Sequence, residues 1–155
     1  MQTLLRTLTI GAILAIATGT ALAADAVVGT WKLNVAKSTF SPGPVPKSQT
    51  RTYAESAQGM TVTIKTMAAD GKESSTTTSF KDDGKPYPVS GNPDFDKISL
   101  TRVDASTAHI TQTKAGATVG TGVRTVSKDG KTLTVALKGT RAGGKFDDVS
   151  VFDRQ

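Results

Sequence analysis

Hydrophobic and polar residues alternate along most of the chain after residue 27. The clearest example is residues 132–139, where Leu133, Val135 and Leu137 alternate with threonine, alanine and lysine. A period of two is typical of a β-strand with one buried face and one solvated face. The pattern predicts nine strands and a short additional piece, at residues 28–35, 48–55, 60–67, 74–81, 97–103, 107–114, 118–128, 132–139, 146–154 and 86–89.

Turn-forming residues separate these strands at short intervals. The tripeptide Asp-Gly-Lys occurs at residues 70–72, 83–85 and 129–131, and Asp-Gly is favoured in tight hairpins. Residues 37–47 and 86–94 are predicted as loops because they contain several prolines, which cannot donate to a strand ladder. No stretch has the spacing of an amphipathic helix. We therefore predict an all-β fold, an antiparallel up-and-down β-barrel of about eight to ten strands.

The alternation also assigns one face of each strand to the interior of this barrel. Hydrophobic residues two apart make up this face: Trp31 and Leu33, Val62 and Ile64, Ile98 and Leu100, Ala108 and Ile110, Val149 and Val151. Continuing the same faces adds Arg102 and Gln112, which are polar and would need partners or water inside a barrel. Either these two residues line a partly hydrated cavity, or they mark the point where a strand emerges at the rim.

The first residues have the three parts of a secretory signal peptide. Arg6 supplies a basic start, residues 10–17 are apolar, and Ala21-Leu22-Ala23 fits a small-x-small cleavage site. The apolar run is shorter than the ~20 residues of a membrane span. The prediction is a signal peptide at residues 1–23, cleaved after Ala23, and one barrel domain at residues 24–155 that is periplasmic or secreted. A retained N-terminal anchor is the alternative.

Composition narrows the chemistry of the exported domain. The chain has no cysteine, which excludes disulfides, thiol catalysis and cysteine metal sites. Its formal net charge is +6, but the lysines are scattered and do not alternate with aromatic residues as single-strand nucleic-acid binders require. One Trp, two Tyr and five Phe are too few for the aromatic girdles of an outer-membrane barrel. We expect neither a nucleic-acid partner nor a membrane-spanning domain.

No set of residues suggests an active site. His109 is the only histidine, and a triad or a metal site needs further partners. Asp147 and Asp148 are neighbours in a predicted strand, so their side chains point to opposite faces and cannot share one proton transfer. Asp82 and Asp83 open a predicted turn, which explains them without a function. We expect no enzyme activity, no cofactor and no metal.

The start of the first predicted strand resembles a known signature. Gly29-Thr30-Trp31 is similar to the Gly-x-Trp motif of the calycins, which include lipocalins, fatty-acid-binding proteins and avidins. The resemblance implies a lipocalin-like barrel in which an arginine from a late strand packs over the signature tryptophan and closes one end. Arg154 is the residue we assign to this barrel-closing contact with Trp31, and Arg124 is the other candidate. A guanidinium over an indole is a cation–π contact.

The chain departs from the fatty-acid-binding proteins in two respects. Those proteins place two helices between their first two strands, and the proline-rich residues 37–47 cannot form them. The Arg-x-Tyr pair that binds a fatty-acid carboxylate has no clean match. The chain also resembles a group of exported bacterial proteins with a Trp-x-Leu-Asn start at residues 31–34, an Asp-Gly-Lys-x-Tyr-Pro-Val segment at residues 83–89 and a Ser-Lys-Asp-Gly-Lys-Thr-Leu-Thr hairpin at residues 127–134.

These observations favour a binding protein that holds a small, partly hydrophobic ligand in a barrel cup. The alternative is an envelope protein-interaction or structural module whose barrel is filled by its own side chains and whose proline-rich loops make the contacts. Tyr53 and Tyr87 are expected at the rim of the cup. The residues expected to line the cavity are Trp31, Val62, Ile64, Ile98, Leu100, Arg102, Gln112 and Arg124.

Overall fold

The computed structural model describes residues 25–155 as an all-β domain, and the predicted signal peptide lies outside these residues. The strands are β1 (Gly29–Leu33), β2 (Thr39–Ser41), β3 (Ser48–Ser56), β4 (Gly59–Met67), β5 (Glu73–Phe80), β6 (Asp83–Pro88), β7 (Lys97–Arg102), β8 (Thr107–Lys114), β9 (Ala117–Val126), β10 (Thr132–Arg141) and β11 (Gly144–Arg154). A single 3-10 turn, η1 (Val35–Lys37), follows β1.

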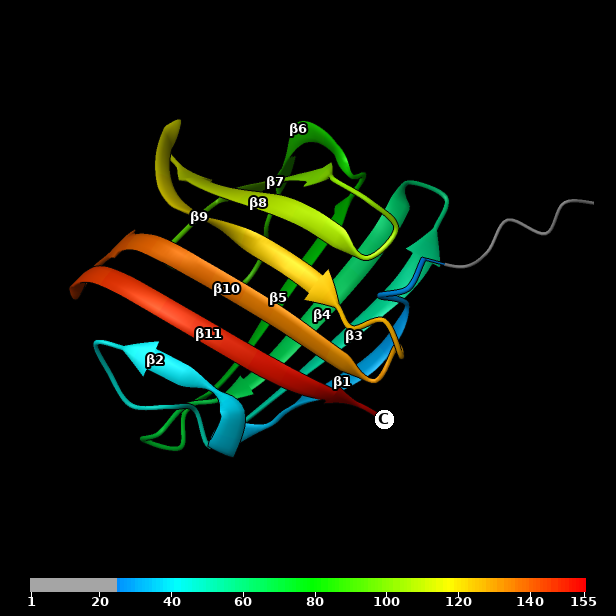
Figure 1. Cartoon of the computed structure of the whole chain (residues 1–155). Helices are drawn as coiled ribbons and strands as arrows, with labels where there is room; N and C mark the ends of the chain where they lie inside the picture. Colours follow the sequence, from blue (N-terminus) through cyan, green and yellow to red (C-terminus); the bar gives the residue numbers. More distant parts are fainter. Residues whose placement is uncertain (1–24) are drawn as a thin grey trace, which may run out of the picture.

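All the strands belong to one antiparallel sheet that curls into a nearly closed barrel (Figure 1). Its order is β5-β4-β3-β1-β11-β10-β9-β8-β7-β6, so almost every strand pairs with its neighbours in sequence. Pairing of β1 with β11 brings the first and last strands of the domain together. The predicted antiparallel up-and-down barrel is therefore confirmed.

The barrel closes between β5 and the segment that follows β6, without a full ladder. Thr77 and Ser90 form an isolated antiparallel bridge. The hydroxyl groups of Thr76 and Thr78 donate to the carbonyl oxygens of Gly91 and Pro88, at 3.3 and 2.8 Å. Threonine side chains thus replace part of the backbone pairing that a continuous ladder would have supplied.

One turn prediction and one loop prediction need correction. Asp83-Gly84-Lys85 is the irregular start of β6, where the register against β7 shifts, and it is not a hairpin turn. Residues 37–47 contain β2, which was predicted as loop. This short strand extends the edge begun by β1, since Phe40 pairs with Asp148 on β11. Three residues ahead of Pro42 are too few to give a recognisable alternation.

One face prediction is also wrong. On β11 the buried side chains are Asp148, Ser150 and Phe152, and Val149 and Val151 are only half-buried. The register decides this, because Phe152 pairs with the buried Leu133 and Ser150 with the buried Val135. Directly opposite residues in an antiparallel pair share a face. The alternation was present in the sequence, but two polar residues occupy its inward positions.

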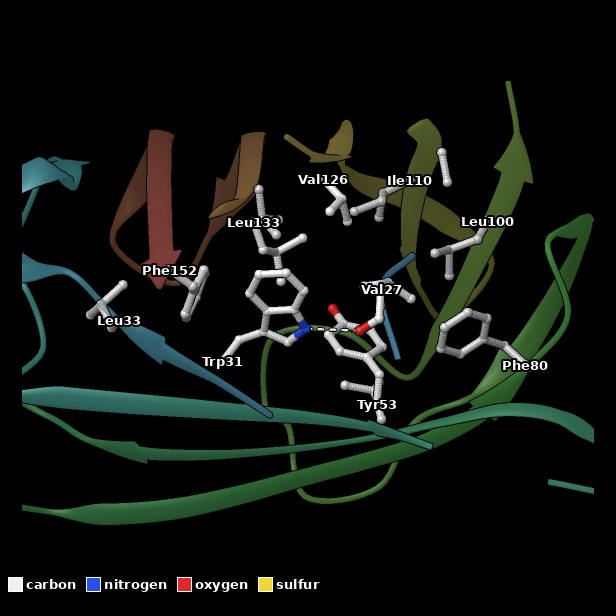
Figure 2. Close-up of a cluster of buried hydrophobic side chains, with 13 residues drawn as sticks. Val27, Trp31, Leu33, Tyr53, Phe80, Leu100, Ile110, Val126, Leu133 and Phe152 are labelled. Atoms are coloured by element: carbon white, nitrogen blue, oxygen red, sulfur yellow. Dashed lines mark hydrogen bonds between the residues drawn. The ribbon is translucent and has the colours of Figure 1, made fainter. Parts of the chain in front are cut away.

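The main hydrophobic core fills one end of the barrel, which we call the closed end (Figure 2). Trp31, Leu133 and Phe152 are fully buried there. Val27, from the segment before β1, is also buried and acts as a plug across this end. The indole Nε1 of Trp31 donates to the Val27 carbonyl at 2.8 Å, so the one polar atom of the indole is satisfied inside the core.

Candidate functional site

The other end of the barrel, which we call the cavity end, contains an interior cavity of about 230 Å³. Strands from all round the barrel contribute to its wall. Its apolar wall includes Ile64 from β4, Ile98 from β7, Ile110 from β8 and Leu137 from β10. Phe95, from the connection between β6 and β7, adds an aromatic ring.

A smaller cavity of about 40 Å³ lies deeper, toward the closed end. Ile64, Ile98, Ile110, Phe95 and Arg51 line both cavities, so the two are neighbours along one interior space. Apart from Arg51 and Arg124, the wall of the smaller cavity is largely hydrophobic. Its further wall residues include Tyr53, Val62, Phe80 and Leu100.

A partly buried ion pair lies in the wall of the larger cavity. The two terminal nitrogens of Arg141 contact the two carboxylate oxygens of Asp148, at 2.9 and 3.4 Å. The backbone N–H of Ser41 also donates to Asp148, at 3.1 Å. The guanidinium of Arg141 lies over the ring of Phe146, 4.5 Å from its centroid. Asp148 and Arg141 therefore satisfy each other, and the fork-to-fork geometry fixes both side chains.

Arg51 is the second arginine in the wall, and it has no such partner. Its Nε donates to the Gln49 side-chain oxygen at 3.0 Å, and the Gln49 amide donates to Thr66 at 2.9 Å. Its guanidinium lies 4.8 Å from the centroid of the Phe152 ring. Among residues 25–155, no carboxylate oxygen lies within 4.0 Å of an Arg51 nitrogen. Arg51 thus brings an unneutralised positive charge into the interior.

Two buried polar side chains face the same cavity. Gln112 is 8% exposed and Ser150 is 5% exposed, and both line the larger cavity. Gln112 pairs with Gly120 on β9, and a Cβ at Gly120 would lie 2.5 Å from its side-chain oxygen. The missing side chain at Gly120 therefore makes room for the Gln112 amide. Within the described residues, neither this amide nor the Ser150 hydroxyl has a hydrogen-bond partner.

A chain of charged side chains crosses the closed end. Asp82 accepts from Arg102 and from Arg124, each at 3.1 Å, and Arg102 also pairs with Asp25. Arg124 lies over the rings of Tyr53 and Phe80, 5.6 and 6.0 Å from their centroids. One oxygen of Asp82 and one terminal nitrogen of Arg124 are buried without a hydrogen-bond partner among residues 25–155. A buried water is the usual solution for such groups.

The pKa values at this end follow from the same contacts. Burial pulls the pKa of Asp25 upward, but hydrogen bonds from Arg102 and from the Val27 N–H outweigh it, and the pKa is lowered overall. The hydrogen bond to Asp25 raises the pKa of Arg102. The charged forms of both side chains are therefore favoured in the folded protein.

The structure brings together six of the eight residues predicted to line the cavity. Gln112 lines the larger cavity, and Ile64 and Ile98 line both. The remaining three, in the smaller cavity, are Val62, Leu100 and Arg124.

Three placements differ from the sequence-based expectation. Trp31 lines neither cavity, because the plug residue Val27 and the surrounding core enclose it completely. Arg102 is exposed beyond the last buried position of β7 and contributes to the ion network. Tyr53 is buried in the wall of the smaller cavity and is not at the rim, whereas Tyr87 is half-buried on β6 and donates to Asp83.

Sequence reasoning missed Arg51 and Asp148. Arg51 alternates with Gln49 and Tyr53, so an inward assignment of Tyr53 would have placed all three on the interior face. Asp148 shares a face with Phe152, and it was missed because β11 was assigned the opposite face. Both errors concern polar residues at inward positions, where the hydrophobic pattern gives no signal.

The remaining candidate groups lie on the surface or lack partners. His109 is exposed on the outer face of β8. Residues 25–155 contain no group of three His, Cys, Asp or Glu side chains placed to hold a metal ion. In the same part of the chain, no helix has the length and apolar character needed to cross a membrane.

Comparisons with known proteins give a remote likeness among solved structures. No family model matches the chain. No curated protein matches it either. Among solved structures, zebrafish ileal bile acid-binding protein in complex with cholic acid is similar over 84% of this chain and 99% of that one, with a TM-score of 0.49 and 10% sequence identity.

Proposed function

We propose that this protein is an exported, non-catalytic binding protein that holds a small, partly hydrophobic ligand inside its barrel. The observation that carries the proposal is the interior cavity of about 230 Å³, whose isoleucine and phenylalanine walls are interrupted by a few inward polar groups. Ligand sites typically combine a mostly apolar wall with a small number of placed polar groups.

The size of the cavity limits the ligand. Pockets that bury drug-sized molecules usually measure about 300–1,000 Å³. A cavity of about 230 Å³ suits a smaller molecule, and the adjoining space of about 40 Å³ could take only one or two of its groups. The completely filled closed end prevents a long ligand from passing through the barrel.

Two further parts of the proposal rest on the sequence. Export rests on the signal-peptide pattern of residues 1–23, with the folded domain released into the periplasm or the medium. The non-catalytic assignment is supported by the position of His109 on the outer surface, away from both cavities.

The isoleucines give a direct test. Ile64, Ile98 and Ile110 are the only isoleucines of residues 25–155, and all three line the cavity. We would label isoleucine and valine methyl groups with ¹³C and titrate the protein with a panel of small molecules while recording NMR spectra. A ligand in the cavity shifts the three isoleucine signals and leaves Val123, on the outer face of β9, unchanged.

A second test uses protein purified gently from the cells that make it. Native mass spectrometry would measure its mass before and after denaturation. A reproducible extra mass that is lost on denaturation supports the carrier and identifies its ligand. A bare mass together with unmoved isoleucine signals would contradict the proposal. The filled-barrel interaction module would then be the better account.

A further inference from the structure

We propose that the ligand is a small organic oxyanion, a carboxylate or a phosphate monoester, whose charged group is bound by Arg51 and Gln112 while its apolar body lies against Ile64, Ile98 and Ile110. This inference rests on the proposed binding function. It adds the chemical class of the ligand and the two side chains that recognise it.

The first argument is the charge of Arg51. The other two arginines of the interior wall each contact a carboxylate, Arg141 on Asp148 and Arg124 on Asp82. Asp94 also lines the larger cavity, but none of its oxygens lies within 4.0 Å of an Arg51 nitrogen. Arg51 is half-buried, so its charge is partly removed from water without a counter-charge, and an anion in the cavity would supply one.

The second argument is the geometry of the Arg51 side chain. Its Nε is already bonded to Gln49, and the guanidinium lies over the face of Phe152. These contacts fix the guanidinium plane and leave the two terminal nitrogens for another acceptor, because no acceptor among residues 25–155 engages them. A fixed guanidinium matches the paired oxygens of a carboxylate or phosphate better than a flexible lysine would.

The third argument is independent of charge and concerns Gln112. Gln112 is 8% exposed as a residue, its side-chain oxygen lies in the space left by Gly120, and its amide makes no hydrogen bond in the described part of the chain. The Ser150 hydroxyl is a second unpartnered group on the same wall. Both side chains face the cavity without a hydrogen-bond partner in the described part of the chain, so they are available to a polar ligand there.

The apolar part of the cavity wall determines the character of the uncharged part of the ligand. Ile64, Ile98 and Ile110 present apolar surface, so the part of the molecule away from the charge should be hydrophobic. The volume of about 230 Å³ favours a compact body such as one ring or a short chain. A long fatty acid exceeds this space.

The experiment compares anions with neutral molecules of matched shape. Benzoate and phenyl phosphate are titrated against benzamide and benzyl alcohol, and hexanoate against hexanamide, using the isoleucine methyl signals and calorimetry. We expect the anions to bind at least about tenfold more tightly than their neutral counterparts, since hydrogen bonds to charged groups are worth about that factor or more. The tighter of benzoate and phenyl phosphate identifies the preferred head group.

Variants test which side chains produce the preference for anions. Arg51→Gln should abolish the advantage of the anions, and Arg51→Lys should restore part of it. Gln112→Leu, which keeps an apolar side chain of similar size, should weaken anion binding several-fold while leaving neutral ligands unaffected. Lys65→Gln is the matched control, since it removes one exposed positive charge from the outer face of β4 and should change nothing. The folded state of each variant is checked by its melting temperature.

The possible failures can be distinguished. If neutral and anionic probes shift the isoleucines with equal affinity, the binding function stands and the oxyanion inference is overturned. The oxyanion inference is likewise overturned if Arg51→Gln retains the full preference for anions. If Arg51→Gln does not fold, the same result with Gln112→Leu overturns it. If no member of the panel moves the isoleucine signals at millimolar concentration, the proposed binding function itself fails.

Discussion

Arg154 lies over the indole of Trp31, with its guanidinium carbon 4.1 Å from the ring centroid. The same guanidinium donates to the carbonyl oxygens of Ala26, Val28 and Gly130, each at 2.6 to 2.7 Å. One side chain from the last strand therefore holds the ring of the first strand, the segment that carries the plug Val27, and the turn between β9 and β10. This contact ties together the two ends of the described chain.

Replacing Arg154 should consequently loosen the closed end. We expect Arg154→Ala to lower the free energy of unfolding by about 1–3 kcal/mol, the sum of a cation–π contact and charged hydrogen bonds that are partly screened by solvent. Arg154→Lys should recover part of this loss, because it keeps the charge but not the planar fork. Urea denaturation followed by Trp31 fluorescence measures both. Equal stabilities for all three proteins would mean that the contact contributes nothing.

Gly29 has a specific relationship to Arg154. Its φ is +131°, and a Cβ at this position would lie 2.7 Å from a terminal nitrogen of Arg154. Gly29→Ala should therefore suffer both backbone strain and displacement of Arg154. Gly43 has φ +130° with nothing within 4 Å of its would-be Cβ, so Gly43→Ala isolates the strain. We expect Gly29→Ala to lose more stability than Gly43→Ala. The difference between these two variants should be smaller in a protein that also carries Arg154→Ala.

The adjacent residues Asp82 and Asp83 should respond very differently to the same change. Among residues 25–155, Asp82 supplies the only carboxylate that contacts the buried Arg124, so we expect Asp82→Asn to lose about 3–5 kcal/mol in unfolding free energy. Asp83 is exposed and bonds to the Lys85 N–H and the Tyr87 hydroxyl, so Asp83→Asn should change stability little. Thermal and denaturant unfolding of the two variants compare them directly. Similar losses would show that the Asp82 network does not stabilise the closed end.

Asp25 makes the stability of the closed end sensitive to acid. Its pKa is lowered in the folded protein, so the carboxylate contributes stability that is complete above the ordinary aspartate pKa of 3.8. That contribution is lost as the pH falls below 3.8 and through the folded-state pKa. We expect the stability difference between the native protein and Asp25→Asn to be constant from pH 7 to about pH 5 and to shrink below pH 4. A stability difference between the two proteins that grows as the pH falls would contradict the lowered pKa of Asp25.

Two glycines on β9, Gly120 and Gly122, should respond differently to the same substitution. A Cβ at Gly120 would meet the end of the flexible Gln112 side chain at 2.5 Å, so Gly120→Ala should fold normally while displacing the Gln112 amide. A Cβ at Gly122 would lie 1.9 Å from the Ala136 carbonyl oxygen, which belongs to the backbone of β10 and cannot move cheaply. We therefore expect Gly122→Ala to lose stability, and Gly120→Ala to lose ligand affinity with a nearly native melting temperature. Melting curves and the isoleucine methyl titration measure the two effects, and a loss of stability in Gly120→Ala as large as that in Gly122→Ala would contradict the contrast.

The alternation of hydrophobic and polar residues was sufficient to predict the all-β fold and nearly every strand. The reason is physical, because side chains of a strand point alternately to its two faces and a barrel buries only one of them. Asp129-Gly130 similarly predicted a turn, and the Asp129 side chain indeed accepts from the Lys131 N–H there. Such features depend on residues close in sequence.

The interior of the barrel was decided by tertiary structure. The register between β10 and β11 turned Asp148 and Ser150 inward, against the expectation from Val149 and Val151. The plug Val27 enclosed Trp31 and removed it from the cavity wall. A one-residue change of register exchanges the two faces of a strand, and local sequence fixes this only where the inward positions are hydrophobic. The amino-acid sequence by itself therefore determined the β-barrel fold. The packing of the strands decided which polar side chains meet inside the barrel.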